Sequence, residues 1–292
     1  MSLPAKFSLS IGGITVQITS DQILEEAAAF VPFISSCESS DFRAIFQQVD
    51  QLPPFSAQVL HEDSCYRVHP DENGGYVRTF FDAPRDYTPY ALATYDYAHG
   101  QINVKYLSKG AHCVSQLHNS FFHLGFEALL IHRHRLCLHA SCVDTSLGGI
   151  LFSGVSGIGK STQAELWCKH RSSRQINGDR PILSKGQKGW LAWGSPYAGS
   201  SRCHVNESCP VTAIVMLKQD AECNLRRLSL PEAFRAVWSG LTMHSWDEKL
   251  VEKASELTMD LISTVPVFEF GCTPDERAVD YLEECLREEC CL

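Results

Sequence analysis

The residues best suited to chemistry form a glycine-rich segment near the middle of the chain. The segment fits the pattern G-x-x-x-x-G-K-[ST] at every fixed position and reads Gly154, Val155, Ser156, Gly157, Ile158, Gly159, Lys160, Ser161. Glycines let the backbone curl so that successive N–H groups point at phosphate oxygens, and a helix beginning there adds the positive end of its dipole. Lys160 supplies a mobile charge, and the Ser161 hydroxyl can ligate Mg²⁺. With Thr162 behind it, the segment predicts a nucleotide site for ATP and Mg²⁺.

Two further residues flank this segment in the sequence. His139 precedes it, within Leu138-His139-Ala140-Ser141, and Asp179 follows it, directly before Arg180. A carboxylate that closes a short segment after the phosphate-binding helix can hold Mg²⁺ or take the proton of an attacking hydroxyl. The residue types alone leave a core histidine at 139 and a turn aspartate at 179 as equal alternatives.

A polar loop over residues 194–206 is a candidate lip for the phosphoryl acceptor. It contains Tyr197, Arg202 and Asn206, whose side chains can hydrogen-bond to a substrate. A plain surface loop is the equal alternative.

The flanking patterns indicate which elements position these residues. The apolar run at 149–153 predicts a strand that enters the glycine-rich segment, and residues 162–169 predict a helix that leaves it. A run at 136–143 predicts a strand that carries His139. The continuous apolar run at 211–217 is typical of a strand covered on both faces.

The N-terminal part follows a different pattern. Residues 7–19 alternate apolar and polar around Gly12-Gly13, which predicts a hairpin, and mainly antiparallel sheet is expected up to about residue 109. A helix is then predicted from apolar residues at spacings of three and four, namely Leu117, Phe121, Leu124, Ala128 and Ile131. We therefore expect a boundary between an N-terminal α+β domain at 1–112 and a catalytic domain at 113–292.

Composition narrows the classes of partner. The 292 residues include 34 acidic and 25 basic side chains, and the net charge of -9 disfavours nucleic acid. No apolar run is long enough to span a membrane and no secretion signal opens the chain, so a cytoplasmic protein without a membrane partner is expected. The 13 cysteines contain no C-x-x-C pair, which favours reduced, mostly buried thiols over a zinc site.

The flanking residues, taken with the glycine-rich segment, resemble a known family. The run 138–141, the segment 154–161 and Gly178-Asp179-Arg180 are similar to the catalytic domain of HPr serine kinase/phosphorylase, which is itself similar to phosphoenolpyruvate carboxykinase. The resemblance covers roughly residues 113–280 and implies an α/β phosphate-loop kinase fold. It also implies that His139, Lys160 and Asp179 are catalytic and that Ser161 and Asp179 bind the metal.

The departures from that family bear on the substrate. HPr kinases carry two adjacent aspartates where this chain has Gly178-Asp179, so Asp179 is a candidate for both metal binding and proton removal. His139 is the alternative group for taking the acceptor proton. Residues 193–197 also differ from the family's pattern, so HPr itself is not the first choice of acceptor. The chain looks more like divergent relatives, some of which phosphorylate a serine of a peptide.

The leading hypothesis is therefore an ATP- and Mg²⁺-dependent kinase that transfers the γ-phosphoryl group to a hydroxyl. The acceptor is a serine or threonine of a peptide or protein, or a small-molecule alcohol. The alternative is a nucleotide-binding regulatory or scaffold module without phosphotransfer, and a carboxykinase-like decarboxylase ranks lowest. The sequence leaves open the acceptor, the reverse reaction, a homo-oligomer and the role of residues 1–112.

Overall fold

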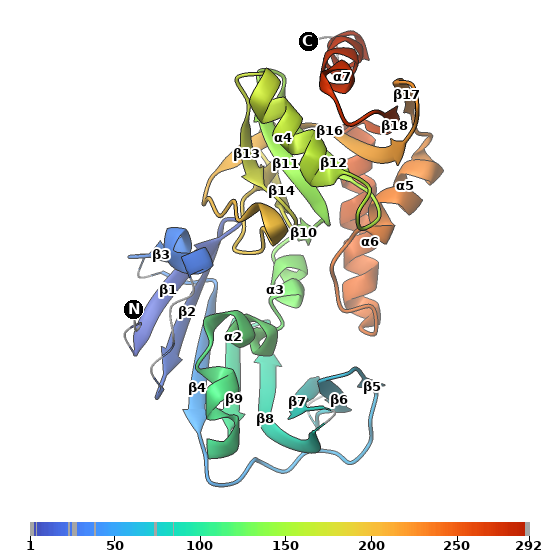
Figure 1. Ribbon diagram of the computed structural model, residues 1–292. Coiled ribbons are helices and arrows are strands. Elements are labelled where there is room, and N and C mark those ends of the chain that lie inside the picture. Colours follow the sequence, from blue (N-terminus) through green and yellow to red (C-terminus); the bar gives the residue numbers. More distant parts are fainter. Residues whose placement is uncertain are drawn as a thin grey trace. The chain divides into compact units, whose positions relative to one another are not determined.

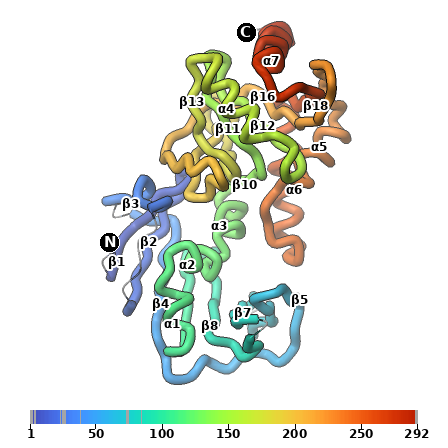
Figure 2. Tube along the Cα trace, viewed as in Figure 1, coloured from blue at the N-terminus to red at the C-terminus, as the bar shows by residue number. Residues whose placement is uncertain are grey.

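The computed structural model describes residues 3, 5–22, 24, 28–37, 39–72, 75–83 and 85–289. The contacts between residues divide the chain into two compact units, Met1–Leu129 and Leu130–Leu292. Both units can be followed in Figures 1 and 2. The sequence predicts a boundary at residue 112, so the helical stretch that follows residue 112 packs largely with the first unit. The assignment of two functional domains stays a prediction.

The first unit is built on one large sheet. Its strands are β1 (Lys6–Ile11), β2 (Ile14–Ser20), β3 (Ile34–Ser35), β4 (Phe42–Gln48), β5 (His61–Glu62), β6 (Tyr66–Pro70), β7 (Tyr76–Asp82), β8 (Asp86–Asp96) and β9 (Gln101–Tyr106). They lie in the order β3-β1-β2-β4-β9-β8-β7-β6-β5. The pairs β2/β4 and β4/β9 are parallel, and the other described pairs are antiparallel. The predicted hairpin is confirmed, with Gly12 and Gly13 at φ of 59° and 72° in its turn.

Short helices supply the apolar side chains that pack in this unit's core. They are η1 (Ala28–Phe33), η2 (Ser108–Gly110), α1 (Ala111–Val114) and α2 (Leu117–Leu124), followed by α3 (Phe126–His132). Phe121 of α2 contacts the rings of Phe30 and Phe126 at 5.0 and 4.9 Å. The sequence predicts one continuous helix here, but Gly125 adopts φ 61° and ends α2. A left-handed glycine after the last turn is a common helix stop, so the predicted helix is two helices.

Arg78 of β7 lies buried in this core, with 1% of its surface exposed. Its guanidinium carbon lies 4.3 Å from the ring centre of Tyr66 and 5.0 Å from that of Phe80. Nη1 donates to the backbone oxygen of Phe122 at 3.2 Å. Among the described residues, Nε and Nη2 have no hydrogen-bond partner. The charge is therefore held mainly by aromatic faces.

The second unit combines a mixed sheet with longer helices. Its strands are β10 (Arg135–Cys137), β11 (Ala140–Thr145), β12 (Gly148–Ser153), β13 (Arg174–Asn177), β14 (Ile182–Gly186), β15 (Gly189–Trp193), β16 (Ser208–Gln219), β17 (Asn224–Arg227) and β18 (Val267–Cys272). The main path is β10-β14-β15-β16-β12-β11-β13, and β18 joins β16 to β17. As predicted, the run 211–217 is a largely buried strand, β16, and β12 and β18 run parallel to it.

The helices of this unit are η3 (Gly199–Ser201), α4 (Lys160–His170), α5 (Leu230–Ser239), α6 (Glu248–Thr264) and α7 (Glu276–Glu289). Ala164 and Trp167 of α4 share a buried cluster with Leu282 of α7 and with Phe152 of β12. This packing fixes the start of α4 relative to the end of β12. The protein is thus a mixed α/β structure with two large sheets.

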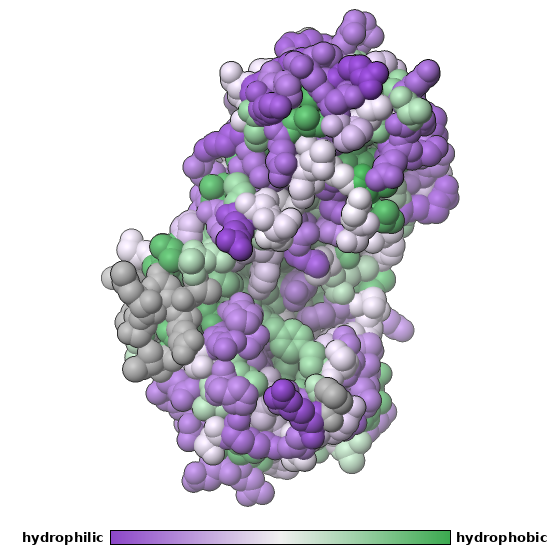
Figure 3. Space-filling model, in the orientation of Figure 1, coloured by the Kyte–Doolittle hydropathy of each residue, from purple (hydrophilic) through white to green (hydrophobic). Residues whose placement is uncertain are grey.

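No helix within the described ranges is long and apolar enough to cross a membrane. The face drawn in Figure 3 carries mostly polar residues, with apolar ones in small groups between them.

Candidate functional site

Residues 154–159 form the loop that joins β12 to α4, and Lys160 and Ser161 are the first two residues of that helix. Gly154, Gly157 and Gly159 have φ of 139°, 78° and 116°, which side-chain-bearing residues rarely adopt. A Cβ atom at Gly157 or Gly159 would meet no atom within 4 Å, so the backbone conformation, not crowding, requires glycine there. No side chain caps the start of α4. The first N–H groups of that helix thus face the loop without a side-chain acceptor, as an anion site needs.

Lys160 lies buried at the start of α4, with 8% of its surface exposed. Its Nζ donates to the backbone oxygens of Gly154 and Val155, each at 3.2 Å, so the side chain folds back over its own loop. Burial lowers the pKa of Lys160, while the charge of Asp179 acts in the opposite direction. A buried cation held only by backbone oxygens of a glycine-rich loop is suited to receive phosphate oxygens.

A hollow of about 420 Å³ adjoins the loop. Gln163 of α4 lies in its wall, is 2% exposed and donates to the backbone oxygen of Thr273 at 3.2 Å. The other lining residues are Gly157, Ile158, Gly159, Thr162, Gln219, Asp220, Cys272 and Pro274. Its volume lies in the range of small-ligand pockets and suits a nucleoside whose phosphates reach the loop.

A tight turn after β13 presents Asp179. The buried side chain of Asn177 accepts hydrogen bonds from the backbone N–H of Asp179 at 2.9 Å and of Arg180 at 2.7 Å. The turn is also tied to the first residue of β11, because the N–H of Ala140 donates to the backbone oxygen of Asp179 at 2.9 Å. An asparagine side chain that bonds its own backbone two residues on is a stable turn device. The carboxylate position is thereby fixed.

His139 meets this carboxylate directly. Its Nε2 lies 3.2 Å from Asp179 Oδ1, and the two side chains are 33% and 28% exposed. Burial, then the charge of Lys160, lowers the pKa of His139, although Asp179 opposes both effects. The imidazole is therefore mainly neutral at pH 7 and can donate Nε2–H to the carboxylate. The prediction that His139 lies on a strand is wrong, because it occupies a bend between β10 and β11.

Two residues that were not predicted as site residues complete this group. Arg180 Nε lies 3.4 Å from Asp179 Oδ2, and its guanidinium also donates to the hydroxyl of Thr242. Arg180 is adjacent to Asp179 in the sequence, and a basic residue next to a candidate catalytic carboxylate could have been predicted as part of the site. Thr242 lies far along the chain, and no local pattern marks it.

The predicted acceptor lip packs against the turn. A Cβ atom at Gly178 would overlap the Ser201 hydroxyl and lie 2.7 Å from the backbone oxygen of Ala198, and one at Gly199 would lie 3.0 Å from Asp179 Cβ. The N–H of Arg180 donates to the backbone oxygen of Tyr197 at 3.2 Å. The side chains of Arg202 and Asn206 are exposed. A role for Tyr197, Arg202 and Asn206 in binding the acceptor stays a prediction.

The described residues offer few ligands for Mg²⁺ apart from those at the loop and at Asp179. Within the described ranges, no group of three or more His, Cys, Asp and Glu side chains could hold a metal ion. Mg²⁺ in nucleotide sites commonly takes one carboxylate, water and phosphate oxygens, with a loop hydroxyl. Ser161 and Asp179 supply oxygen ligands of this kind, so the residues fit a metal that arrives with the nucleotide.

Comparisons with known proteins find a partial likeness to solved structures alone. No protein-family model and no curated protein matches the chain. Among solved structures, it is similar in part to the Hpr(Ser) kinase/phosphatase from Coxiella burnetii, with 13% identity and a TM-score of 0.33. The match covers 52% of this chain and 97% of that one.

Proposed function

We propose that the protein is an ATP- and Mg²⁺-dependent kinase that transfers the γ-phosphoryl group to a hydroxyl acceptor. The observation that carries this proposal is the 3.2 Å pair of His139 and Asp179, whose carboxylate also acts on the charge of Lys160 in the glycine-rich loop. Phosphoryl transfer depends mainly on positioning and on compensating charge, and these residues supply both. We assign the chain, on its sequence motifs, to the divergent relatives of HPr kinase.

We assign the following roles to the side chains as part of this proposal. Lys160 and the loop N–H groups hold the phosphates, and residues 155–159 and Thr162 complete the cradle. Ser161 and Asp179 would hold Mg²⁺, which would supply positive charge to the phosphate oxygens. As the acceptor oxygen bonds to the γ-phosphorus and ADP leaves, the hydroxyl proton passes to the carboxylate of Asp179. His139 and Arg180 hold the two carboxylate oxygens in place.

The test pairs nucleotide binding with turnover. Wild-type protein is titrated with ATP and Mg²⁺ by calorimetry, and its melting temperature should rise with ATP. Lys160→Ala should remove most of the calorimetric binding heat and most of the ATP-dependent rise in melting temperature. The melting temperature without ATP should stay near that of the wild type. ADP release is then measured with serine-containing peptides, a protein acceptor and small alcohols. Absence of binding at millimolar ATP would rule out the proposal.

A nucleotide-dependent scaffold is the second candidate. It is favoured by one observation, that both oxygens of Asp179 already face basic side chains, those of His139 and Arg180. ATP binding without ADP release for any acceptor would select this candidate. Acceptor-dependent ADP release that is lost in His139→Ala would select the kinase.

A further inference from the structure

One face of the first unit's sheet is left open to solvent. In β4, Phe42, Ala44 and Phe46 are buried, whereas Arg43, Ile45 and Gln47 are exposed. The neighbouring strand β9 repeats this alternation, with Asn103 and Lys105 on the more exposed side. Such alternation marks a sheet with one packed and one accessible face. The accessible face carries polar side chains from adjacent strands.

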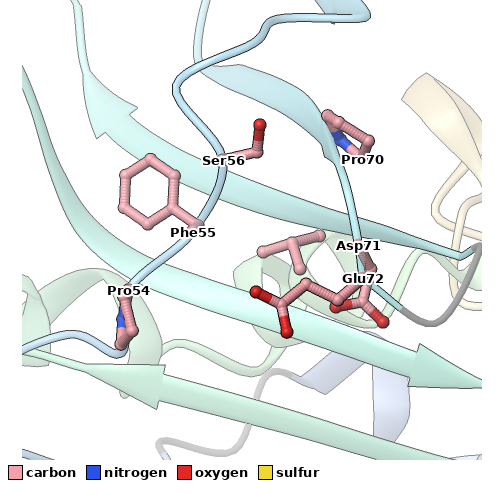
Figure 4. Close-up of a pocket in the computed structure, with 7 residues that line it drawn as sticks. Pro54, Phe55, Ser56, Pro70, Asp71 and Glu72 are labelled. Carbon is pink, nitrogen blue, oxygen red and sulfur yellow. The ribbon is translucent and has the colours of Figure 1, made fainter.

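The segment 53–56 crosses this face and lines two adjoining hollows. Figure 4 shows the first hollow, with Pro54, Phe55 and Ser56 on the crossing segment and Asp71 and Glu72 on the facing side. This hollow has a volume of about 530 Å³. Pro70 and Val77 complete its described lining.

The residues that line the first hollow favour a ligand with a positively charged group at the end of an aliphatic chain. Asp71 and Glu72 supply two carboxylates, and none of the described residues lining the hollow is basic. Pro54 and Val77 offer apolar surface for methylene groups, and the ring of Phe55, 39% exposed, can face a cation. An arginine or lysine side chain has this combination of stem and charge.

The crossing segment is fixed before any ligand arrives. His69 is buried, and its ring nitrogens lie 3.0 Å from the backbone oxygen of Gln58 and 3.0 Å from Thr79 Oγ1. The ring of Phe55 packs on that of His69, with centroids 4.8 Å apart. Adjacent prolines at 53 and 54 further restrict the backbone. A preorganised wall reduces the entropy lost on binding.

A second hollow continues from the first. It has a volume of about 460 Å³ and shares Pro54, Asp71 and Val77 with it. Its remaining lining residues are Gln47, Pro53, Leu92, Thr94, Asn103 and Lys105. The amides, the hydroxyl and the ammonium group can bond the carbonyl and N–H groups of a chain in extended conformation. Two joined hollows of different chemistry fit consecutive residues of one peptide.

We propose that this open sheet face binds an extended peptide through an arginine or lysine side chain placed between Phe55, Asp71 and Glu72. The neighbouring backbone of the peptide lies over Gln47, Asn103 and Lys105. That the bound peptide also carries the acceptor hydroxyl rests on the proposed kinase function. The proposal that the face binds a peptide does not depend on the kinase function.

Peptide binding is tested on the full chain by fluorescence anisotropy. The probe is a fluorescein-labelled ten-residue peptide of glycine and serine with two central arginines, and a matched peptide has two central glutamates. Because an exposed ion pair contributes little, we expect Glu72→Gln to weaken arginine-peptide binding about threefold to fivefold. Asp71→Asn combined with Glu72→Gln should weaken it about tenfold or more. Asp82→Asn, which removes an exposed charge elsewhere in the unit, should leave it unchanged.

Several results would overturn the proposal. These are equal affinity for the two peptides, wild-type affinity in the double variant, or loss of binding in the Asp82→Asn control. Displacement by spermine as effective as by unlabelled peptide would assign the hollow to small polyamines instead. ATP titration of the same samples separates the two proposals. Peptide binding without ATP binding would reject only the kinase, and ATP binding without peptide binding would reject only this inference.

Discussion

Arg78 in the first unit and Lys160 in the second are both buried basic side chains, yet their surroundings differ in kind. Arg78 is enclosed by the rings of Tyr66, Phe80 and Phe122. Lys160 contacts two backbone oxygens of an open glycine-rich loop. Aromatic faces cannot be exchanged without repacking the core, whereas backbone oxygens can be exchanged for those of a ligand. A ligand could therefore replace the partners of Lys160 without repacking a core, whereas the partners of Arg78 are part of one.

The largest expected effect concerns the second unit. Asp179→Asn keeps the size of the side chain but removes the negative charge that acts on both Lys160 and His139. Turnover should fall by about 10² to 10⁴, as for loss of a general base, while ATP affinity changes little. Steady-state ADP release and calorimetric titration on one preparation provide the check. Turnover within a few-fold of wild type would remove Asp179 from the mechanism.

The corresponding change in the first unit should affect stability alone. Arg78→Ala removes a large buried side chain and should lower the free energy of unfolding by about 3 kcal/mol. Arg78→Met retains most of the volume and removes the unpartnered nitrogens, so its loss should be smaller. All five tryptophans lie in the second unit and seven of nine tyrosines lie in the first. The tyrosine-detected melting temperature should therefore fall, while ATP binding stays unchanged. An unchanged tyrosine-detected melting temperature with weaker ATP binding would contradict a purely structural role for Arg78.

Acidification offers a third comparison. Burial lowers the pKa of His123 to about 4, below the ordinary value of about 6.5. Between these two values His123 is protonated in the unfolded chain but neutral in the folded first unit. Its contribution to stability is therefore complete above pH 6.5 and is lost as the pH falls towards 4. The loss approaches about 3 kcal/mol. His123→Gln should flatten the tyrosine-detected stability profile across this window and leave the tryptophan-detected one unchanged. An equally steep tyrosine-detected profile would exclude His123 as the cause.

The smallest effect is expected at Gly178. Gly178→Ala forces a Cβ atom against Ser201 and should cost about 1 to 3 kcal/mol, seen in tryptophan-detected melting. Ser201→Gly should recover part of this loss in the double variant, because the backbone oxygen of Ala198 still lies 2.7 Å from the added Cβ atom. Additive losses would show that the two residues do not contact each other in solution.

The sequence predicted the local features well. The glycine-rich loop, the strand before it, the helix after it and the hairpin at residues 7–19 all follow from short patterns. Prediction failed where one residue redirects the chain. Gly125 splits a helix whose apolar spacing is continuous, and the bend at His139 interrupts an apolar run that looks like one strand. Arg180 and Thr242 illustrate a second limit, because their contact joins residues that only the tertiary fold brings together.

The close packing of Ser201 on Gly178 restricts how this site can change by mutation. The resembled family has an aspartate at the position of Gly178, but here the Ser201 Cβ atom lies 2.5 Å from where even a methyl group would be. Ser201→Ala keeps that atom, so loss of the hydroxyl alone makes no room. Glycine at 201 would not be enough either, because the backbone oxygen of Ala198 lies 2.7 Å from the same position. A second carboxylate at 178 would therefore require the backbone of residues 198–201 to move, so the single carboxylate is not one mutation away from a pair.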